Sequence, residues 1–248
     1  MSSSSRVKQA AATTTTLEFR EVVKDYRTGG ETVRAVDGVS LRIDPGELVA
    51  LYGPSGSGKS TLLLIAAAVL APDSGGVYVN GRDVTRLSAR ESAAYRMREL
   101  GFISQAIDLL DGANAVTNAA LKLYGLGMRV GPANRRVAKM LEAVGLGERL
   151  NHRPAELSMG ERQRVLIVRA LSTEPRVVLA DEPTGALDSE RTTEVLELLR
   201  AVTTERRIAT LLVTHDPQAA GYADRMYTLR DGALARSPEQ ATPAPTAP

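Results

Sequence analysis

The chain has 248 residues, enough to bury one large core, and its 43% hydrophobic and 24% charged residues are ordinary for a globular domain. It has no cysteine, which excludes a disulfide framework and a thiolate metal site. The formal net charge of +2 gives no indication of a nucleic-acid partner, because such partners are usually met by a clustered basic face.

The two ends of the chain differ in composition from everything between them. Residues 1–16 are rich in Ser, Thr and Ala, and residues 237–248 are rich in Pro and Ala, so both are predicted to be disordered tails around one folded region at 17–236. The start has no apolar core of signal-peptide length. The longest apolar stretch, Leu62 to Ala71, is about half of what a membrane-spanning helix needs, so we expect a buried helix there.

Apolar runs and helical patterns alternate along the folded region. The predicted strands are Glu47–Tyr52, Val77–Asn80, Gly101–Ser104, Val177–Ala180, Thr210–Thr214 and Met226–Leu229. Helices are predicted to follow Lys59, Ser88, Ala133, Ser158, Ser189 and Asp216. This alternation favours an α/β fold with a mostly parallel sheet covered on both faces. Residues 106–157 contain no convincing strand and are predicted to form a helical insertion.

A phosphate-binding pattern follows the first of these strands directly. Residues 53–60 read Gly-Pro-Ser-Gly-Ser-Gly-Lys-Ser, which is GxxxxGK[ST] between a strand and a helix. The glycines let backbone N–H groups face phosphate oxygens, and the helix N-terminus adds favourable partial charge. Lys59 would reach the β- and γ-phosphates and the Ser60 hydroxyl would bind Mg²⁺. The alternative is a flexible Gly/Ser loop, which the flanking strand and helix disfavour. The candidate phosphate ligands are Gly53, Ser55, Gly56, Ser57, Gly58, Lys59 and Ser60.

A second carboxylate-bearing segment lies downstream. The apolar strand at Val177 ends in Asp181 and Glu182. Alone, such an ending is usually only a turn. Beside a phosphate loop, Asp181 is placed to hold Mg²⁺ and Glu182 to polarise a water for attack on the γ-phosphate.

The segment at Ser158 permits two interpretations. Ser158 and Glu161 have the spacing of a capping box at the start of an amphipathic helix. A serine hydroxyl and the Gly160 N–H at a helix start also form an anion site.

Taken in order, these segments resemble the ABC ATPases. They are GPSGSGKST at 53–61, Gln105 after a strand, LSMGE at 157–161, VVLADEP at 177–183, ALD at 186–188 and His215 after a strand. The resemblance covers residues 17 to 236. It implies a P-loop NTPase (RecA-like) core, a small antiparallel β subdomain and an inserted helical subdomain at about 106–157.

The resemblance implies roles for further residues of the same chain. Tyr26 would stack on adenine, unless it is an ordinary core or surface tyrosine. Thr61 would support the α-phosphate. Gln105 would sense Mg²⁺ and the attacking water, and His215 would contact the γ-phosphate.

Other residues would serve a second copy of the chain. In the family, two subunits close head-to-tail around MgATP, so Ser158 and Gly160 would complete the opposite subunit's site and Asp188 would cross the dimer seam. Met159 stands where the family usually has Gly, and its side chain is expected to crowd that loop and slow closure.

Glu161, Gly185 and the loop Thr28–Arg34 resemble one branch in particular, which contains the lipoprotein-release, macrolide-export, cell-division and peptide-resistance ABC ATPases. The implied function is an ATP-hydrolysing subunit that powers a separately encoded integral membrane permease. It would lie on the cytoplasmic face of the membrane and bind no nucleic acid.

The alternatives are an ATP-dependent docking regulator without net transport and an importer ATPase. The intact Glu182 and His215 argue against a non-hydrolysing regulator, which Met159 alone favours. The cargo and the direction of transport stay open.

Overall fold

The computed structural model describes residues 15–185 and 187–235. The predicted tails therefore lie almost entirely outside the described residues and stay predictions. No helix in the described part of the chain is both long enough and apolar enough to cross a membrane.

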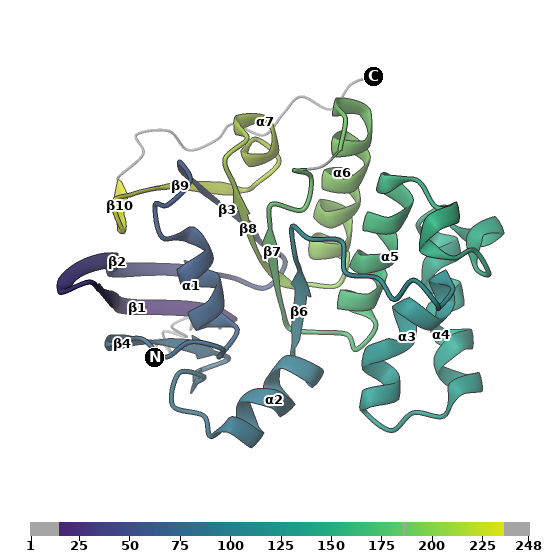
Figure 1. Cartoon of the computed structure of the whole chain (residues 1–248), viewed down its shortest axis with the longest axis horizontal. Helices are drawn as coiled ribbons and strands as arrows, with labels where there is room; N and C mark the ends of the chain where they lie inside the picture. The colour runs from purple at the N-terminus through teal and green to yellow at the C-terminus, as the bar shows by residue number, and fades with distance from the viewer. Residues whose placement is uncertain (1–14, 186, 236–248) are drawn as a thin grey trace, which may run out of the picture.

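A six-stranded sheet forms the centre of the molecule (Figure 1). Its order is β10-β9-β3-β8-β7-β6, and every neighbouring pair is parallel except β10 with β9. The strands are β3 (Leu48–Tyr52), β6 (Leu100–Ile103), β7 (Val177–Asp181), β8 (Ala209–Thr214), β9 (Arg225–Arg230) and β10 (Ala233–Ala235). The prediction of a mostly parallel sheet is confirmed. Because parallel strands end at one edge, the residues that follow β3, β7 and β8 are brought together there.

A second, antiparallel sheet has the order β2-β1-β4-β5. Its strands are β1 (Leu17–Thr28), β2 (Glu31–Ile43), β4 (Ser74–Val79) and β5 (Arg82–Asp83). It is the small antiparallel subdomain that the resemblance implied. The predicted strand at Val77–Asn80 belongs to this sheet and not to the parallel one. The long strands β1 and β2 carry register shifts, and much of β2 is exposed, so neither shows an uninterrupted apolar run.

The helices occur where they were predicted, with two changes. They are α1 (Lys59–Ala66), α2 (Ala89–Arg98), α3 (Ala115–Gly125), α4 (Val130–Ala143), α5 (Met159–Leu171), α6 (Ser189–Glu205) and α7 (Pro217–Ala220). Helix α1 ends at Ala66, before the apolar stretch does, and Ala68 has a left-handed φ of 51°. Helix α4 begins at Val130, upstream of Ala133. The insertion also holds α3 and two short 3₁₀ turns, at Gly147–Arg149 and Pro154–Glu156.

Three hydrophobic clusters join these layers. The first packs α1 between the antiparallel sheet and one face of the parallel sheet. The second packs α5, α6 and α7 on the other face of the parallel sheet, and the third holds α3, α4 and α5 together (Figure 1). Helix α5 belongs to both of the last two clusters, through Ile167 and Leu171 in one and Val165 and Val168 in the other. It therefore connects the helical region to the core.

Two glycines permit the loop between β3 and α1 to pass close to neighbouring strands. A Cβ at Gly53 would lie 2.2 Å from the carbonyl oxygen of Leu229, and one at Gly58 would lie 2.0 Å from that of Ala35. Gly58 also has a φ of 101°. No other residue fits these two positions without moving a backbone segment.

We predict that Gly58→Ala lowers the free energy of unfolding by more than about 3 kcal/mol, because a left-handed φ and a backbone clash act together. Gly56 is the matched control: its φ is 81°, but a Cβ there meets nothing within 4 Å. Gly56→Ala should cost only about 1–2 kcal/mol. Denaturant unfolding of both variants tests this, and equal losses would show that the contact with Ala35 does not constrain the loop.

Candidate functional site

The amine of Lys59 lies inside the loop that follows β3. Its Nζ donates hydrogen bonds to the carbonyl oxygens of Gly53 and Pro54, at 2.7 and 2.8 Å, and the residue is only 5% exposed. Burial lowers the pKa of Lys59, and the nearby carboxylates of Glu182 and Asp181 act in the opposite direction. A buried positive charge that faces carbonyl oxygens and two acids is suited to a ligand that carries several negative charges.

Ser60 and Asp181 meet at the same edge of the sheet. The Ser60 side chain makes a hydrogen bond to the carboxylate of Asp181, the last residue of β7. Burial raises the pKa of Asp181, while the bond from Ser60 and the charge of Lys59 lower it. A hydroxyl and a carboxylate are both oxygen donors of the kind that Mg²⁺ prefers.

The residues therefore fit a magnesium ion that is shared with a ligand. Among the described residues there is no group of three or more His, Cys, Asp or Glu side chains that could hold a metal by themselves. Mg²⁺ commonly binds through one or two protein groups together with substrate phosphates and water. The pair Ser60 and Asp181 matches that pattern.

Glu182 and His215 form the next pair along the edge. The Nδ1 atom of His215 lies 2.8 Å from Oε2 of Glu182. Glu182 has a left-handed φ of 45°, and its backbone N–H donates to the carbonyl of Val213 at 2.9 Å. Such a conformation costs a non-glycine residue about 1–3 kcal/mol. A hollow of about 240 Å³ lies beside these two side chains.

Gln105, which follows β6, is brought to the same carboxylate. A Cβ at Gly185 would lie 3.6 Å from Oε2 of Glu182 and 3.7 Å from Nε2 of Gln105. Both polar groups therefore lie over the Gly185 backbone. The structure thus brings together Lys59, Glu182 and His215, and places Gln105 next to them, as the sequence led us to expect.

The remaining loop residues differ in their surroundings. Ser55 and Gly56 are exposed and Thr61 is half-buried. Ser57 is 4% exposed, and its Oγ has no hydrogen-bond partner among the residues that the structure describes. An unpaired hydroxyl within a phosphate-type loop is a further polar group that a ligand could satisfy.

Tyr26 lies on β1, in the antiparallel sheet, and is 40% exposed. The Nζ of Lys24 lies 6.0 Å from the centroid of its ring. The ring is thus an accessible aromatic surface, and its predicted contact with adenine stays a prediction.

The predicted second half-site begins at Ser158, on the opposite face of the parallel sheet from α1 (Figure 1). The capping box is confirmed, because Ser158 Oγ accepts from the Glu161 N–H at 3.2 Å and Glu161 Oε2 accepts from the Ser158 N–H at 2.7 Å. In the described part of the chain, no hydrogen bond or ion pair joins Ser158 or Gly160 to residues 53–61.

Asp188 is the N-cap of α6 and accepts a hydrogen bond from the Arg191 N–H at 3.0 Å. That bond and the charge of Arg191 hold the pKa of Asp188 below its usual value. Sequence analysis missed Arg191, although its position three residues after Asp188 is visible in the sequence.

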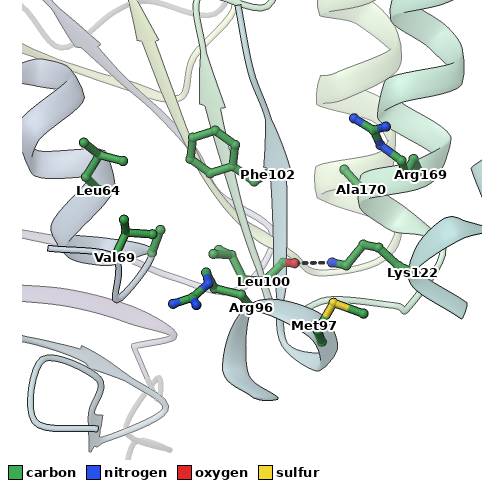
Figure 2. A pocket seen from close by; sticks show the side chains of 10 residues that line it. Leu64, Val69, Arg96, Met97, Leu100, Phe102, Lys122, Arg169 and Ala170 are labelled. Atoms are coloured by element: carbon green, nitrogen blue, oxygen red, sulfur yellow. Dashed lines mark hydrogen bonds between the residues drawn. The ribbon is translucent and has the colours of Figure 1, made fainter. Parts of the chain in front are cut away.

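A second hollow, which the sequence did not predict, opens between α1, α2, β6, α3 and α5 (Figure 2). It has a volume of about 390 Å³, and we call it the apolar groove. Its mostly apolar lining includes Leu64, Val69, Met97, Leu100 and Phe102. Val69 and Phe102 are 59% and 36% exposed, so the groove presents apolar surface to the solvent.

Three cations line the apolar groove, Arg96 of α2, Lys122 of α3 and Arg169 of α5, and among the described residues none of them forms an ion pair with a carboxylate (Figure 2). Lys122 Nζ donates to the carbonyl oxygen of Leu100 at 2.6 Å, and Arg169 Nη1 donates to that of Asp108 at 2.7 Å. Burial, together with the charge of Arg169, lowers the pKa of Lys122 to about 8.

The loop between β3 and α1, the paired acids after β7 and the histidine after β8 define a P-loop nucleoside-triphosphate hydrolase. The comparisons with known proteins give the family. The family model described as "ABC transporter" matches residues 36–185. The chain belongs to the ABC transporter ATP-binding family, and it is an ABC-type ATPase, the ATP-binding subunit of such a system.

Individual relatives agree with that assignment. The chain is 44% identical to the lipoprotein-releasing system ATP-binding protein LolD 1 of Rhodopirellula baltica, over 89% of this chain and 96% of that protein. It is 41% identical to the macrolide export ATP-binding/permease protein MacB of Marinobacter nauticus, over 88% of this chain but only 34% of that protein. Its structure is similar to the dimeric ATP-binding cassette MJ0796 bound to ADP and Pi, with a TM-score of 0.81, 35% identity and coverage of 89% and 97%.

The groove also yields a prediction about pH. Lys122 has a pKa of about 8 in the folded chain, below its unfolded value of about 10.4, so the unfolded state binds more protons between these values. Stability should therefore rise as the pH increases from 8 to 10.4. In Lys122→Met this rise should be smaller, with the part that the buried Lys59 contributes still present. It should be undiminished in Lys139→Met, which alters an exposed lysine with no ion pair among the described residues. Denaturant unfolding at pH 7, 8, 9 and 10 tests this, and parallel profiles for wild type and Lys122→Met would contradict it.

Proposed function

We propose that the chain binds MgATP at the carboxyl edge of its parallel sheet and hydrolyses it. The observation that carries the proposal is the meeting of a buried Lys59, the Ser60–Asp181 pair and the Glu182–His215 pair at that edge.

Binding uses the loop and the start of α1. Backbone N–H groups of residues 53–61 and the positive end of the helix would face the phosphates. Lys59 would exchange its bonds to Gly53 and Pro54 for bonds to β- and γ-phosphate oxygens. Ser60 and Asp181 would hold Mg²⁺, which neutralises phosphate charge. Thr61 would contact the α-phosphate, and Tyr26 would supply a ring for adenine.

Hydrolysis uses the Glu182–His215 pair. The Glu182 carboxylate would accept a proton from a water whose oxygen attacks the γ-phosphorus, and the bond to the β–γ bridging oxygen breaks to release ADP and phosphate. His215 holds the Glu182 carboxylate through Nδ1 and leaves Nε2 for the γ-phosphate. Gln105, beside the same carboxylate, would orient the water.

Two copies of the chain would share each nucleotide. Support comes from the position of α5 and α1 on opposite faces of the parallel sheet. Among the described residues, the Ser158 hydroxyl and N–H form hydrogen bonds with Glu161, and Ser158 forms none with the loop of its own chain. The similar cassette MJ0796 is dimeric. We propose a head-to-tail homodimer in which Ser158, Gly160 and Asp188 of one chain complete the site of the other.

We also propose that the apolar groove receives an integral membrane permease. Its exposed apolar residues, Val69 and Phe102, suit an amphipathic helix, and the cations Lys122 and Arg169 suit an acidic side chain on that helix. The similar protein MacB of Marinobacter nauticus is named as a macrolide export ATP-binding/permease protein, and this chain matches about a third of its length. Docking through a separate permease would place the chain on the cytoplasmic face of the membrane.

The relatives favour extraction or export over import. They include lipoprotein-releasing and macrolide-export proteins at 41–44% identity. We therefore propose that ATP-driven closure of the dimer moves a permease of this kind.

We predict that Lys59→Ala and Glu182→Gln abolish turnover in different ways. Lys59→Ala removes the buried counter-charge, so the dissociation constant for MgATP should rise at least about tenfold. Glu182→Gln removes only the proton acceptor, so binding should stay within about twofold of wild type while the rate falls at least about a hundredfold. Titration calorimetry and phosphate release measure the two quantities. Near-wild-type turnover of Glu182→Gln would refute its assigned role.

We further predict that a photo-crosslinking residue at Phe102 captures an integral membrane protein from detergent-solubilised membranes of the source organism, identified by mass spectrometry. Val33, which is 56% exposed on the antiparallel sheet, is the control position and should capture none. Crosslinks from position 102 only to a second copy of the chain, or equal capture at both positions, would contradict docking in the groove.

A further inference from the structure

Arg191 holds Asp188 through both its backbone and its side chain. Its N–H donates to one carboxylate oxygen of Asp188 at 3.0 Å, and its Nη1 donates to the other. Both side chains are about half exposed, so the pair lies at the surface where α6 begins. The carboxylate of Asp188 is therefore fixed in direction although it is accessible.

The same side chain covers Gly160 at the start of α5. A Cβ at Gly160 would lie 3.0 Å from Cδ of Arg191 and 3.5 Å from its Cγ. The aliphatic part of Arg191 thus fills the space over Gly160, and any larger residue at 160 would displace it. Gly160 lies in α5 and Asp188 caps α6, yet both contact the same arginine.

The position of this arginine is unfavourable by itself. Arg191 is the third residue of α6, and a cation in the first turn is opposed by the positive end of the helix, by about 0.3–1 kcal/mol. A second contact, between Arg164 of α5 and Glu194 of α6 at 2.7 Å, joins the two helices about one turn further along. Helix stability alone does not account for Arg191, whereas its two contacts do.

We propose that Arg191 is a positioning residue for the ATP site of the opposite chain. It fixes Asp188 and the Ser158–Gly160 loop relative to each other, so that the chain presents them to its partner as one rigid surface. This inference rests on the proposed head-to-tail dimer. It gives the first turn of α6 a positioning role, which is different from the roles of the phosphate-binding residues.

The two parts of the side chain have separable effects. Arg191→Met keeps most of the aliphatic chain over Gly160 but releases Asp188. Arg191→Ala removes both contacts, and Arg191→Lys retains the chain and the charge. Arg191→Ala should therefore be impaired most, Arg191→Met less, and Arg191→Lys least. Arg206→Ala is the matched control, since Arg206 lies at the other end of α6, is exposed and has no ion pair among the described residues.

The first measurement is the dependence of phosphate release on MgATP concentration. In Arg191→Ala the concentration for half-maximal rate should rise about threefold to tenfold, because a less ordered surface is offered to the partner's nucleotide. The rate at saturation should change less than about twofold. Damage to folding alone would lower the saturating rate and leave the half-maximal concentration unchanged, and that result would overturn the proposal.

The second measurement identifies the chain on which Arg191 acts. Arg191→Ala chains are mixed with Lys59→Ala chains and assayed at a MgATP concentration below half-saturation. One site of each mixed dimer then combines an intact loop with an intact Gly160–Asp188 surface, so the activity of the mixture should exceed the average of the two variants measured separately. A parallel mixture of Ser158→Arg with Lys59→Ala shows whether composite sites exist.

The outcomes separate the two ideas. Recovery in the Ser158→Arg mixture without recovery in the Arg191→Ala mixture would overturn the role of Arg191 and leave the proposed function intact. If neither mixture recovers, the composite site fails and the role of Arg191 fails with it. Equal half-maximal MgATP concentrations for Arg191→Ala and Arg206→Ala would also overturn the proposed role of Arg191.

Discussion

The rest of the site depends on one buried positive charge. Lys59 is almost fully enclosed and bonded to two backbone carbonyls, with two carboxylates nearby. Keeping an ammonium group in such a place is costly unless negative charge surrounds it. The glycines at 53 and 58 make the enclosure possible, because they let the loop lie against the carbonyls of Leu229 and Ala35. The loop is thereby fixed to β2 and β9 before any nucleotide arrives.

The second constraint is the division of the molecule by its parallel sheet. Helix α1 packs on one face with the antiparallel sheet, and α5 and α6 pack on the other. Helix α5 also belongs to the cluster of α3 and α4, so packing connects the helical region to the helix that Ser158 caps. The apolar groove lies beside that same helix, next to Arg169. The proposed permease contact and the proposed second half-site therefore lie at the two ends of one helix.

The sequence predicted what depends on local pattern. The phosphate loop, the acids after β7, His215 after β8 and the capping box at Ser158 were all visible, since each is set by neighbours along the chain. Strands β1 and β2 were not visible, because their register shifts and exposed positions break the alternation that marks a strand. The end of α1 was misplaced because Ala67 and Leu70 are packed against the core although they follow the helix.

Local sequence pattern does not predict contacts between distant segments, and only the family resemblance implied that Gln105 and Glu182 act at one site. The closeness of Gln105 to Glu182 depends on the order of β6 and β7 in the sheet, and the burial of Lys122 depends on the packing of α3 over β6. The contact of Arg191 with Gly160 likewise requires α5 and α6 to lie side by side. The motifs thus predicted the chemistry, and the three-dimensional arrangement supports the proposed division of each site between two chains.

That division is tested most directly by the molar mass of the Glu182→Gln protein in solution, measured by light scattering after size-exclusion chromatography. The account predicts one chain per particle without nucleotide and two chains per particle at saturating MgATP. It also predicts that adding Lys59→Ala to the same chain restores the single-chain mass. A particle that remains a single chain at saturating MgATP, with nucleotide demonstrably bound, would contradict it.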